Sequence, residues 1–171
     1  MTTYRVFAEK EGDAALAATL IARTYMDMGA KMIKMTGQLR GLPNADSKYG
    51  MMIANEKDEA VGYAMVTPLK VGDAENAALL LAPLAYDTFR DDVHPNDILE
   101  IVLGYAKDLG FRYVMMHADP EAHEGFGFVD ADTLGVSSDV RYPNSVLLVK
   151  DFGEGQPQAI SGKVIYPPFV S

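Results

Sequence analysis

Apolar and polar residues along this chain follow two kinds of pattern, one typical of strands and one typical of helices. Short apolar or alternating runs, bounded by turn residues, predict strands at 3–8, 49–55, 60–69, 76–86, 112–118 and 144–152. The second and third runs form a hairpin with "EKDE" as its turn. Pro83 lies inside the fourth run and requires a bulge, a sheet edge or a strand end at that point.

Apolar residues spaced three and four apart predict helices between these strands. They fall at 13–29, within 30–43, at 96–110 and, as a short helix, within 120–128. Asp13 can cap the first helix, and Gly29 can end it in a left-handed turn. Asp97 and Glu100 have the spacing of a capping box for the helix 96–110, and Gly110 is its expected end.

The order of these elements predicts a mixed α/β (α+β) fold. Strands that follow one another mostly join through hairpins, and one crossover helix follows residue 86. A chain of 171 residues is long enough for a sizeable core and most simply forms one domain, residues 1–171. No internal repeat or linker divides it.

Charge and composition narrow the classes of function. The chain has 15 basic and 24 acidic residues and a net charge of −9, which disfavours binding to DNA or RNA and suits a cationic partner such as an amine. No apolar run reaches the ~20 residues that span a membrane. The sequence contains no cysteine, so disulfides, thiolate metal sites and cysteine nucleophiles are excluded. The N-terminal residues contain no apolar signal core, and a cytoplasmic location is expected.

Three segments together resemble one enzyme superfamily. They are "ALLLAPLAY" (78–86), "YAKDLGFRYVMMHADPEAHEGFGF" (105–128) and the tail "SGKVIYPPF" (161–169). The first two resemble the GNAT superfamily of acyl-CoA-dependent N-acetyltransferases, and the tail is similar to the ending of one bacterial subgroup. The resemblance implies a single GNAT-like domain with a mixed, splayed β-sheet flanked by helices. Its two central parallel strands would be 76–86 and 112–118.

The resemblance also implies a reaction and a set of site residues. An amine would attack the thioester of acetyl-CoA, the cosubstrate. Backbone groups of Leu84, Ala85 and Tyr86 would bind the thioester carbonyl and the pantetheine amides. His123, at the position of the family's usual tyrosine, would protonate the leaving thiolate. The loop before the helix 96–110 would bind the pyrophosphate, with contacts from Arg90, Val93, His94 and Asn96.

This pyrophosphate loop departs from the family's glycine-rich pattern. In "RDDVHP" (90–95), Val93 stands where the pattern has its first glycine, and Pro95 removes an N–H donor. Asp91 and Asp92 would repel a phosphate. Two interpretations stay open: the loop binds the diphosphate in another way, or it no longer binds it. Locally, an exposed turn ahead of a helix also explains the same residues.

Alternatives remain for the histidines and for the function. His123 also fits a partly exposed helix residue. His117, Asp119 and His123 could bind zinc or iron, but their spacing matches no known signature, and no metal site is predicted. The chain is expected to acetylate an amine of a small molecule or peptide. The alternative is a non-catalytic GNAT-fold protein that binds a ligand or partner chain. A homodimer also stays open.

Overall fold

The computed structural model describes residues 3–123 and 125–170. Its strands are β1 (Arg5–Ala8), β2 (Gly50–Ala54), β3 (Ala60–Val71), β4 (Ala74–Tyr86), β5 (Tyr113–Ala118), β6 (Phe128–Asp130), β7 (Val136–Ser137), β8 (Val146–Asp151) and β9 (Gly162–Ile165). Its α-helices are α1 (Ala14–Tyr25), α2 (Gly29–Arg40) and α3 (Pro95–Asp108). Short 3-10 helices are η1 (Met26–Met28), η2 (Ser47–Tyr49), η3 (Glu121–His123) and η4 (Ala131–Leu134).

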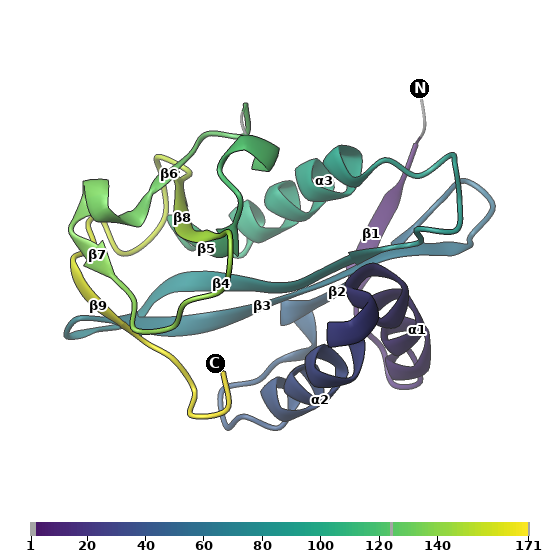
Figure 1. The fold of residues 1–171 in the computed structure, drawn as a ribbon, viewed down its shortest axis with the longest axis horizontal. Coiled ribbons are helices and arrows are strands. Elements are labelled where there is room, and N and C mark those ends of the chain that lie inside the picture. The colour runs from purple at the N-terminus through teal and green to yellow at the C-terminus, as the bar shows by residue number, and fades with distance from the viewer. Residues whose placement is uncertain (1–2, 124, 171) are drawn as a thin grey trace. The chain divides into compact units, whose positions relative to one another are not determined.

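The strands follow the order β1-β2-β3-β4-β5-β8-β6, with β9 paired to β3 and β7 (Figure 1). Strands β4 and β5 run parallel, with Leu79 opposite Val114, whereas β1–β2, β2–β3 and β5–β8 are antiparallel. The sheet is therefore mixed and flanked by helices, as predicted. The two strands expected to run parallel at its centre do so.

By its internal contacts the described chain forms two compact units. The first contains the residues up to Thr67 together with Ala82–Tyr105, and the second contains Pro68–Leu81 together with the residues from Ala106 onward. In the first unit, α1 and α2 lie side by side (Figure 1). The longest buried stretches of this unit are β2 and the first half of β3, whose residues on both faces are inaccessible, as expected for strands covered by helices.

Two predicted helix boundaries in the first unit are wrong. Gly29 does not end α1 in a left-handed turn: its φ is −57° and it begins α2. A Cβ atom at Gly29 would lie 3.1 Å from the Cα of Ala22, so the missing side chain serves close helix packing. The helix α3 starts at Pro95, and the His94 carbonyl accepts hydrogen bonds from the N–H groups of Asp97 and Ile98. Asp97 therefore lies inside the first turn and is no N-cap.

In the second unit, β8 pairs with β5 on one side and β6 on the other, and the tail strand β9 pairs with β7. The helix expected within 120–128 is the three-residue η3. The strands β6 and β7 and the turn η4 were not predicted. They are two to four residues long, which is too short to show a period. None of the described helices has the length and apolar character needed to cross a bilayer.

Candidate functional site

The C-terminal end of β4 is held by side chains from the last turn of α1. The backbone N–H of Leu84 donates to the Tyr25 hydroxyl at 3.0 Å, and the N–H of Tyr86 donates to Thr24 Oγ1 at 3.0 Å. These two amides are two residues apart, so they lie on the same edge of the strand. Ala85, between them, is fully buried. Two backbone donors thus meet side-chain hydroxyls instead of strand carbonyls. The Thr24 hydroxyl also lies 2.9 Å from the carbonyl oxygen of Leu20 and 3.0 Å from that of Tyr86.

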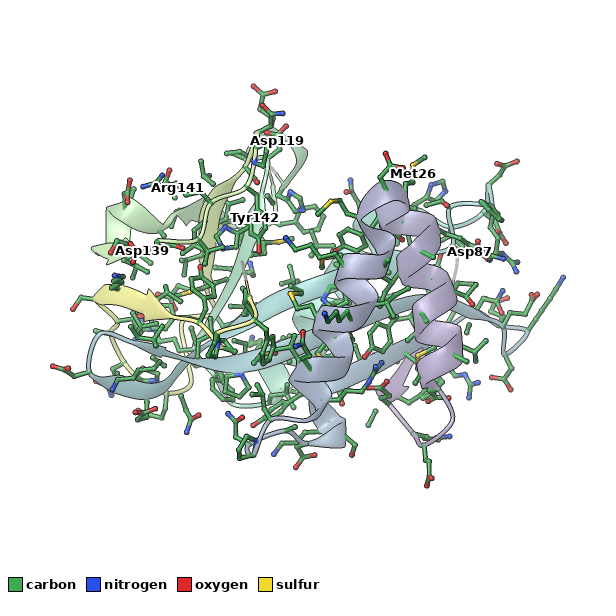
Figure 2. All side chains as sticks on the ribbon, turned by 60° about the horizontal axis from the view of Figure 1, so that its bottom comes forward. Met26, Asp87, Asp119, Asp139, Arg141 and Tyr142 are labelled. Carbon is green, nitrogen blue, oxygen red and sulfur yellow. The ribbon has the colours of Figure 1, made fainter. Side chains whose placement is uncertain are left out.

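The chain leaving β4 is fixed to the same helix. The guanidinium of Arg23 lies 3.0 Å from the carboxylate of Asp87, which is largely buried, and 4.4 Å from the ring centroid of Phe89. The same carboxylate accepts the N–H of Phe89 at 3.1 Å. Figure 2 marks Asp87 and, at the end of α1, Met26. The loop from residue 87 therefore starts from a defined position.

Arg90, the predicted phosphate ligand, is already bound by two carboxylates. Its Nε and Nη2 atoms donate to the two oxygens of Asp92 at 3.0 and 3.1 Å, and its Nη1 donates to Glu59 at 3.0 Å. These bonds raise the pKa of Arg90, and the bond from Arg90 lowers the pKa of Asp92. Hydrogen bonds from Asn55 and then Arg90 lower the pKa of Glu59. Asp92 thus orients Arg90 and neutralises it.

The other predicted loop residues divide between core and surface. Val93 is 6% exposed, so its side chain belongs to the core, while His94 and Asn96 are exposed at the start of α3. Leu84, Tyr86 and Arg90 are half-buried. Ala85 and Val93 are buried, so they can offer a ligand only their backbone groups. The structure brings the predicted backbone donors and the predicted phosphate loop into one unit.

We expect Asp92→Ala to strengthen binding of acetyl-CoA about 10-fold, because Arg90 would lose its bidentate partner and gain freedom to bind phosphate. The matched control is Asp91→Ala, which removes the same charge from the neighbouring exposed position. Calorimetric titration of both variants at one ionic strength measures the difference. Equal affinities for the two variants would contradict a specific role of the Asp92–Arg90 pair.

His123, the predicted acid, lies in the second unit at the end of η3. Its Nδ1 lies 3.2 Å from the backbone carbonyl oxygen of Asp119, and its ring meets that of Phe128 edge to face at 6.3 Å. A carbonyl only accepts, so Nδ1 carries a proton. Nε2 is therefore the atom that can exchange a proton, and the half-exposed ring can deliver one when it is an imidazolium.

A second histidine belongs to a polar chain that the sequence did not predict. His117, on β5, places Nε2 2.8 Å from the hydroxyl of Tyr166, and this hydroxyl lies 2.7 Å from Ser138 Oγ. Ser138 Oγ in turn donates to the carbonyl of Val140 at 2.9 Å. Burial lowers the pKa of His117 to about 4 and raises the pKa of Tyr166 to about 12. Both side chains are therefore neutral near pH 7.

The two histidines of "HADPEAH" turn to different partners. His117 bonds to Tyr166 in the C-terminal tail, while His123 bonds to the backbone of its own turn. Across residues 3–123 and 125–170, no three His, Cys, Asp or Glu side chains are grouped so that they could hold a metal ion. The geometry of this segment thus suits hydrogen bonding and proton exchange.

The lowered pKa of His117 predicts a pH dependence of stability. Unfolding returns the imidazole to its usual pKa near 6.5, so the unfolded chain binds the proton more tightly. The free energy of unfolding should therefore decrease as pH falls from about 6.5 to about 4, by on the order of 2 kcal/mol for this half-buried group. Urea unfolding of the wild type and of His117→Gln across this pH range measures this decrease in the free energy of unfolding. A matched His94→Gln variant, altered at an exposed histidine, should keep the wild-type slope. If His117→Gln kept it too, the assignment would be wrong.

The sequence comparisons found no match: neither a family model nor a curated protein matches the chain. Solved structures do match. YhbS, a GNAT-family N-acetyltransferase from Escherichia coli in complex with CoA, aligns with a TM-score of 0.79 at 20% identity, over 99% of this chain and 92% of that chain. A GNAT-family acetyltransferase from Brucella melitensis in complex with acetyl-CoA aligns with a TM-score of 0.71 at 16% identity, over 99% of both chains.

A third structure, an acetyltransferase of the GNAT family from Staphylococcus aureus, aligns with a TM-score of 0.57 at 11% identity. That alignment covers 88% of this chain and 99% of that chain. The chain therefore has the fold of the GNAT-family acetyltransferases, over nearly its whole length and nearly the whole length of these structures. This confirms the fold that the sequence resemblance implied.

Proposed function

We propose that the chain is a GNAT-superfamily N-acetyltransferase that transfers the acetyl group of acetyl-CoA to an amine, acting as a single domain over residues 1–171. The observation that carries the proposal is the pair of strand-edge amides, Leu84 and Tyr86, which donate to side-chain hydroxyls and not to a neighbouring strand, in a chain with this fold. Acetyl-CoA would supply an activated acetyl thioester.

The amides at the end of β4 fit a carbonyl ligand. The Leu84 N–H and the Tyr86 N–H are fixed by the strand, and their present partners are the hydroxyls of Tyr25 and Thr24. A ligand carbonyl would take the place of these hydroxyls: the Tyr25 ring would have to move, and Thr24 would give up its hydrogen bond to a backbone carbonyl as well. Fixed amide donors stabilise the negative charge that forms on a carbonyl oxygen under attack, and removing one such donor typically costs about 100-fold or more in rate.

Proton exchange is the task proposed for His123. In the transfer, the amine nitrogen forms a bond to the acetyl carbon and loses a proton to water, while the carbon–sulfur bond breaks. The imidazolium of His123 would give its Nε2 proton to the leaving sulfur and then regain one from solvent. The Nδ1 bond to the Asp119 carbonyl supports this role because it fixes the ring while Nε2 exchanges its proton.

Arg90 is not free to bind a phosphate as it stands, since three of its five N–H donors already bind Asp92 and Glu59. If acetyl-CoA binds, Arg90 has to exchange partners, or the exposed start of α3 at His94 and Asn96 has to provide the contacts. The occupied Arg90 is also the observation that favours the second candidate function, a non-catalytic GNAT-fold protein that binds a ligand or partner chain.

The acidic surface supports a small cationic amine over nucleic acid as the partner, and we propose such an amine as the acceptor in a cytoplasmic protein, as monomer or homodimer. The test is release of free thiol from acetyl-CoA in the presence of a panel of amines, with the acetylated product identified by mass spectrometry. Amine-dependent release together with a product heavier by one acetyl group is the expected result. Absence of both for every amine, despite bound acetyl-CoA, would support the non-catalytic function.

A further inference from the structure

A cavity of about 140 Å³ opens in the second unit, and all the residues that line it belong to this unit. Its polar lining comes from His117 on β5, Asp130 and Asp132 around η4, Ser138 and Arg141 in the segment after β7, and Ser145 before β8. This volume holds several water molecules or one small molecule, and lies well below the roughly 300–1,000 Å³ of sites for drug-sized ligands. The cavity therefore suits a ligand of very few heavy atoms.

The residues that line the cavity carry charges of both signs. The positive one, Arg141, has no ion-pair partner among the described residues, and the acid nearest to it in sequence, Asp139, is bound to Lys163 instead. Figure 2 marks Asp139, Arg141 and Tyr142 on the segment between β7 and β8. In contrast, Arg112 of the same unit is held by both oxygens of Asp151. Of the two arginines of this unit, Arg141 is therefore the one that can bind the carboxylate of a ligand.

The lining also presents carboxylates that are partly oriented. Asp130 Oδ1 accepts the backbone N–H of Asp132 at 3.0 Å, which fixes the first carboxylate at the start of η4. The second oxygen of Asp130 and the carboxylate of Asp132 form no salt bridge in the described part of the chain. Carboxylates in this position attract an ammonium group, while Arg141 attracts a carboxylate.

The neutral wall between these charges has fixed hydrogen-bond roles. One set of donors and acceptors accounts for all the hydrogen bonds of this series. His117 Nε2–H donates to Tyr166, the Tyr166 hydroxyl donates to Ser138, and Ser138 donates to the Val140 carbonyl. In this arrangement the Nδ1 atom of His117 carries no proton. It can accept a hydrogen bond but adds no charge, so the balance of charge in the cavity is set by Arg141, Asp130 and Asp132.

We propose that this cavity binds a small zwitterionic amine, an α-amino acid in chemical class, with Arg141 on its carboxylate and Asp130 and Asp132 on its ammonium group. A plain amine would leave Arg141 unmatched, and a plain carboxylate would meet two carboxylates of like charge. Binding of the amino acid stands on the cavity alone. That it is the acceptor of the acetyl group rests on the proposed function.

The test compares three ligands of nearly equal size in calorimetric titrations without acetyl-CoA: alanine, alaninamide, which lacks the carboxylate, and propionate, which lacks the ammonium. We expect alanine to bind the wild type at least about 10-fold more tightly than either analogue, since each analogue loses one charged contact. Glycine and serine extend the series to smaller and more polar side chains.

Two variants assign the contacts. Arg141→Gln should weaken the binding of alanine about 10-fold but not that of alaninamide, whereas Asp132→Asn should weaken the binding of alanine and alaninamide but not that of propionate. Arg5→Gln, at an exposed ion-paired arginine of the first unit, is the matched control and should bind alanine like the wild type. Thermal unfolding of each variant checks that it is folded.

The outcomes separate this inference from the proposed function. Alanine binding that needs Arg141, without any acetyl transfer, would support the zwitterion site and count against the enzyme. Acetyl transfer to other amines, with no heat from glycine, alanine or serine at millimolar concentration, would overturn the zwitterion site and leave the enzyme standing. Equal binding of alanine and alaninamide, unaffected by Arg141→Gln, would also overturn it.

Discussion

Replacing His123 with alanine is expected to lower kcat for acetyl transfer by about 100-fold or more, the usual contribution of a general acid. The reason is that the leaving thiolate would have to take its proton from water, while the Nε2 atom fixed by the Asp119 carbonyl is lost. The KM for acetyl-CoA should change little, because the group acts in the transition state and adds little to ground-state binding. Steady-state kinetics with the best amine of the panel measures both constants.

The control for this variant is Glu121→Ala, which alters a side chain of the same short helix η3 and keeps His123. It should retain wild-type kcat. Full activity of His123→Ala would show that another group, or water, protonates the thiolate. An equal loss in both variants would show that the helix, and not the imidazole, is required.

Replacing Glu9 with alanine is expected to lower the free energy of unfolding by about 3 kcal/mol, the cost of leaving one partner of a buried ion pair alone. Glu9 accepts a hydrogen bond from Arg40 Nε at 2.9 Å and one from the Tyr63 hydroxyl at 3.0 Å, and Arg40 Nη2 forms an ion pair with it at 2.7 Å. Its side chain is 11% exposed and Tyr63 is fully buried. The value is at the lower end of the usual range because the Arg40 side chain is 30% exposed and keeps some water.

This network ties three elements of the first unit together, since Glu9 follows β1, Arg40 ends α2 and Tyr63 lies on β3. Burial raises the pKa of Tyr63, so the hydroxyl stays protonated and donates to Glu9. Urea unfolding of Glu9→Ala measures the effect, and Glu11→Ala, at an exposed position two residues away, is the control. A midpoint of unfolding shared by the two variants would contradict the role given to the network.

Sequence patterns predicted the longer strands of the fold well because these are apolar or alternating runs, whereas β6 and β7 are too short to show a pattern. The run 76–86 and the run around Met115 were long enough to be recognised, and their parallel pairing followed from the family resemblance. Helix ends were harder to predict. The role of Gly29 depends on how closely α1 and α2 pack, which is a tertiary property that its own sequence neighbourhood does not contain.

The candidate site shows the same division between local and distant contacts. The segment 84–86 and the loop from Arg90 were identified from their order along the chain. The partners that decide their chemistry come from elsewhere: Glu59 lies 31 residues before Arg90, and Tyr25 lies 59 residues before Leu84. Tyr166 reaches His117 across 49 residues. No periodicity or motif in the sequence links such pairs.

One of the two neighbouring acids ahead of α3 acquires an explanation in this structure. Asp92 fixes Arg90 as one half of a bidentate pair, so at least one of the acids serves a specific contact. Asp91 is exposed, and no contact within residues 3–123 and 125–170 explains it. Arg90 can therefore bind a phosphate with its Nε and Nη2 atoms only after it releases Asp92.

Binding of acetyl-CoA at the end of β4 is measured most directly by a calorimetric titration of acetyl-CoA into the pure protein at moderate salt. We expect one site per chain with a dissociation constant in the micromolar range. Absence of heat at millimolar acetyl-CoA, in a protein that unfolds cooperatively and is therefore folded, would contradict it.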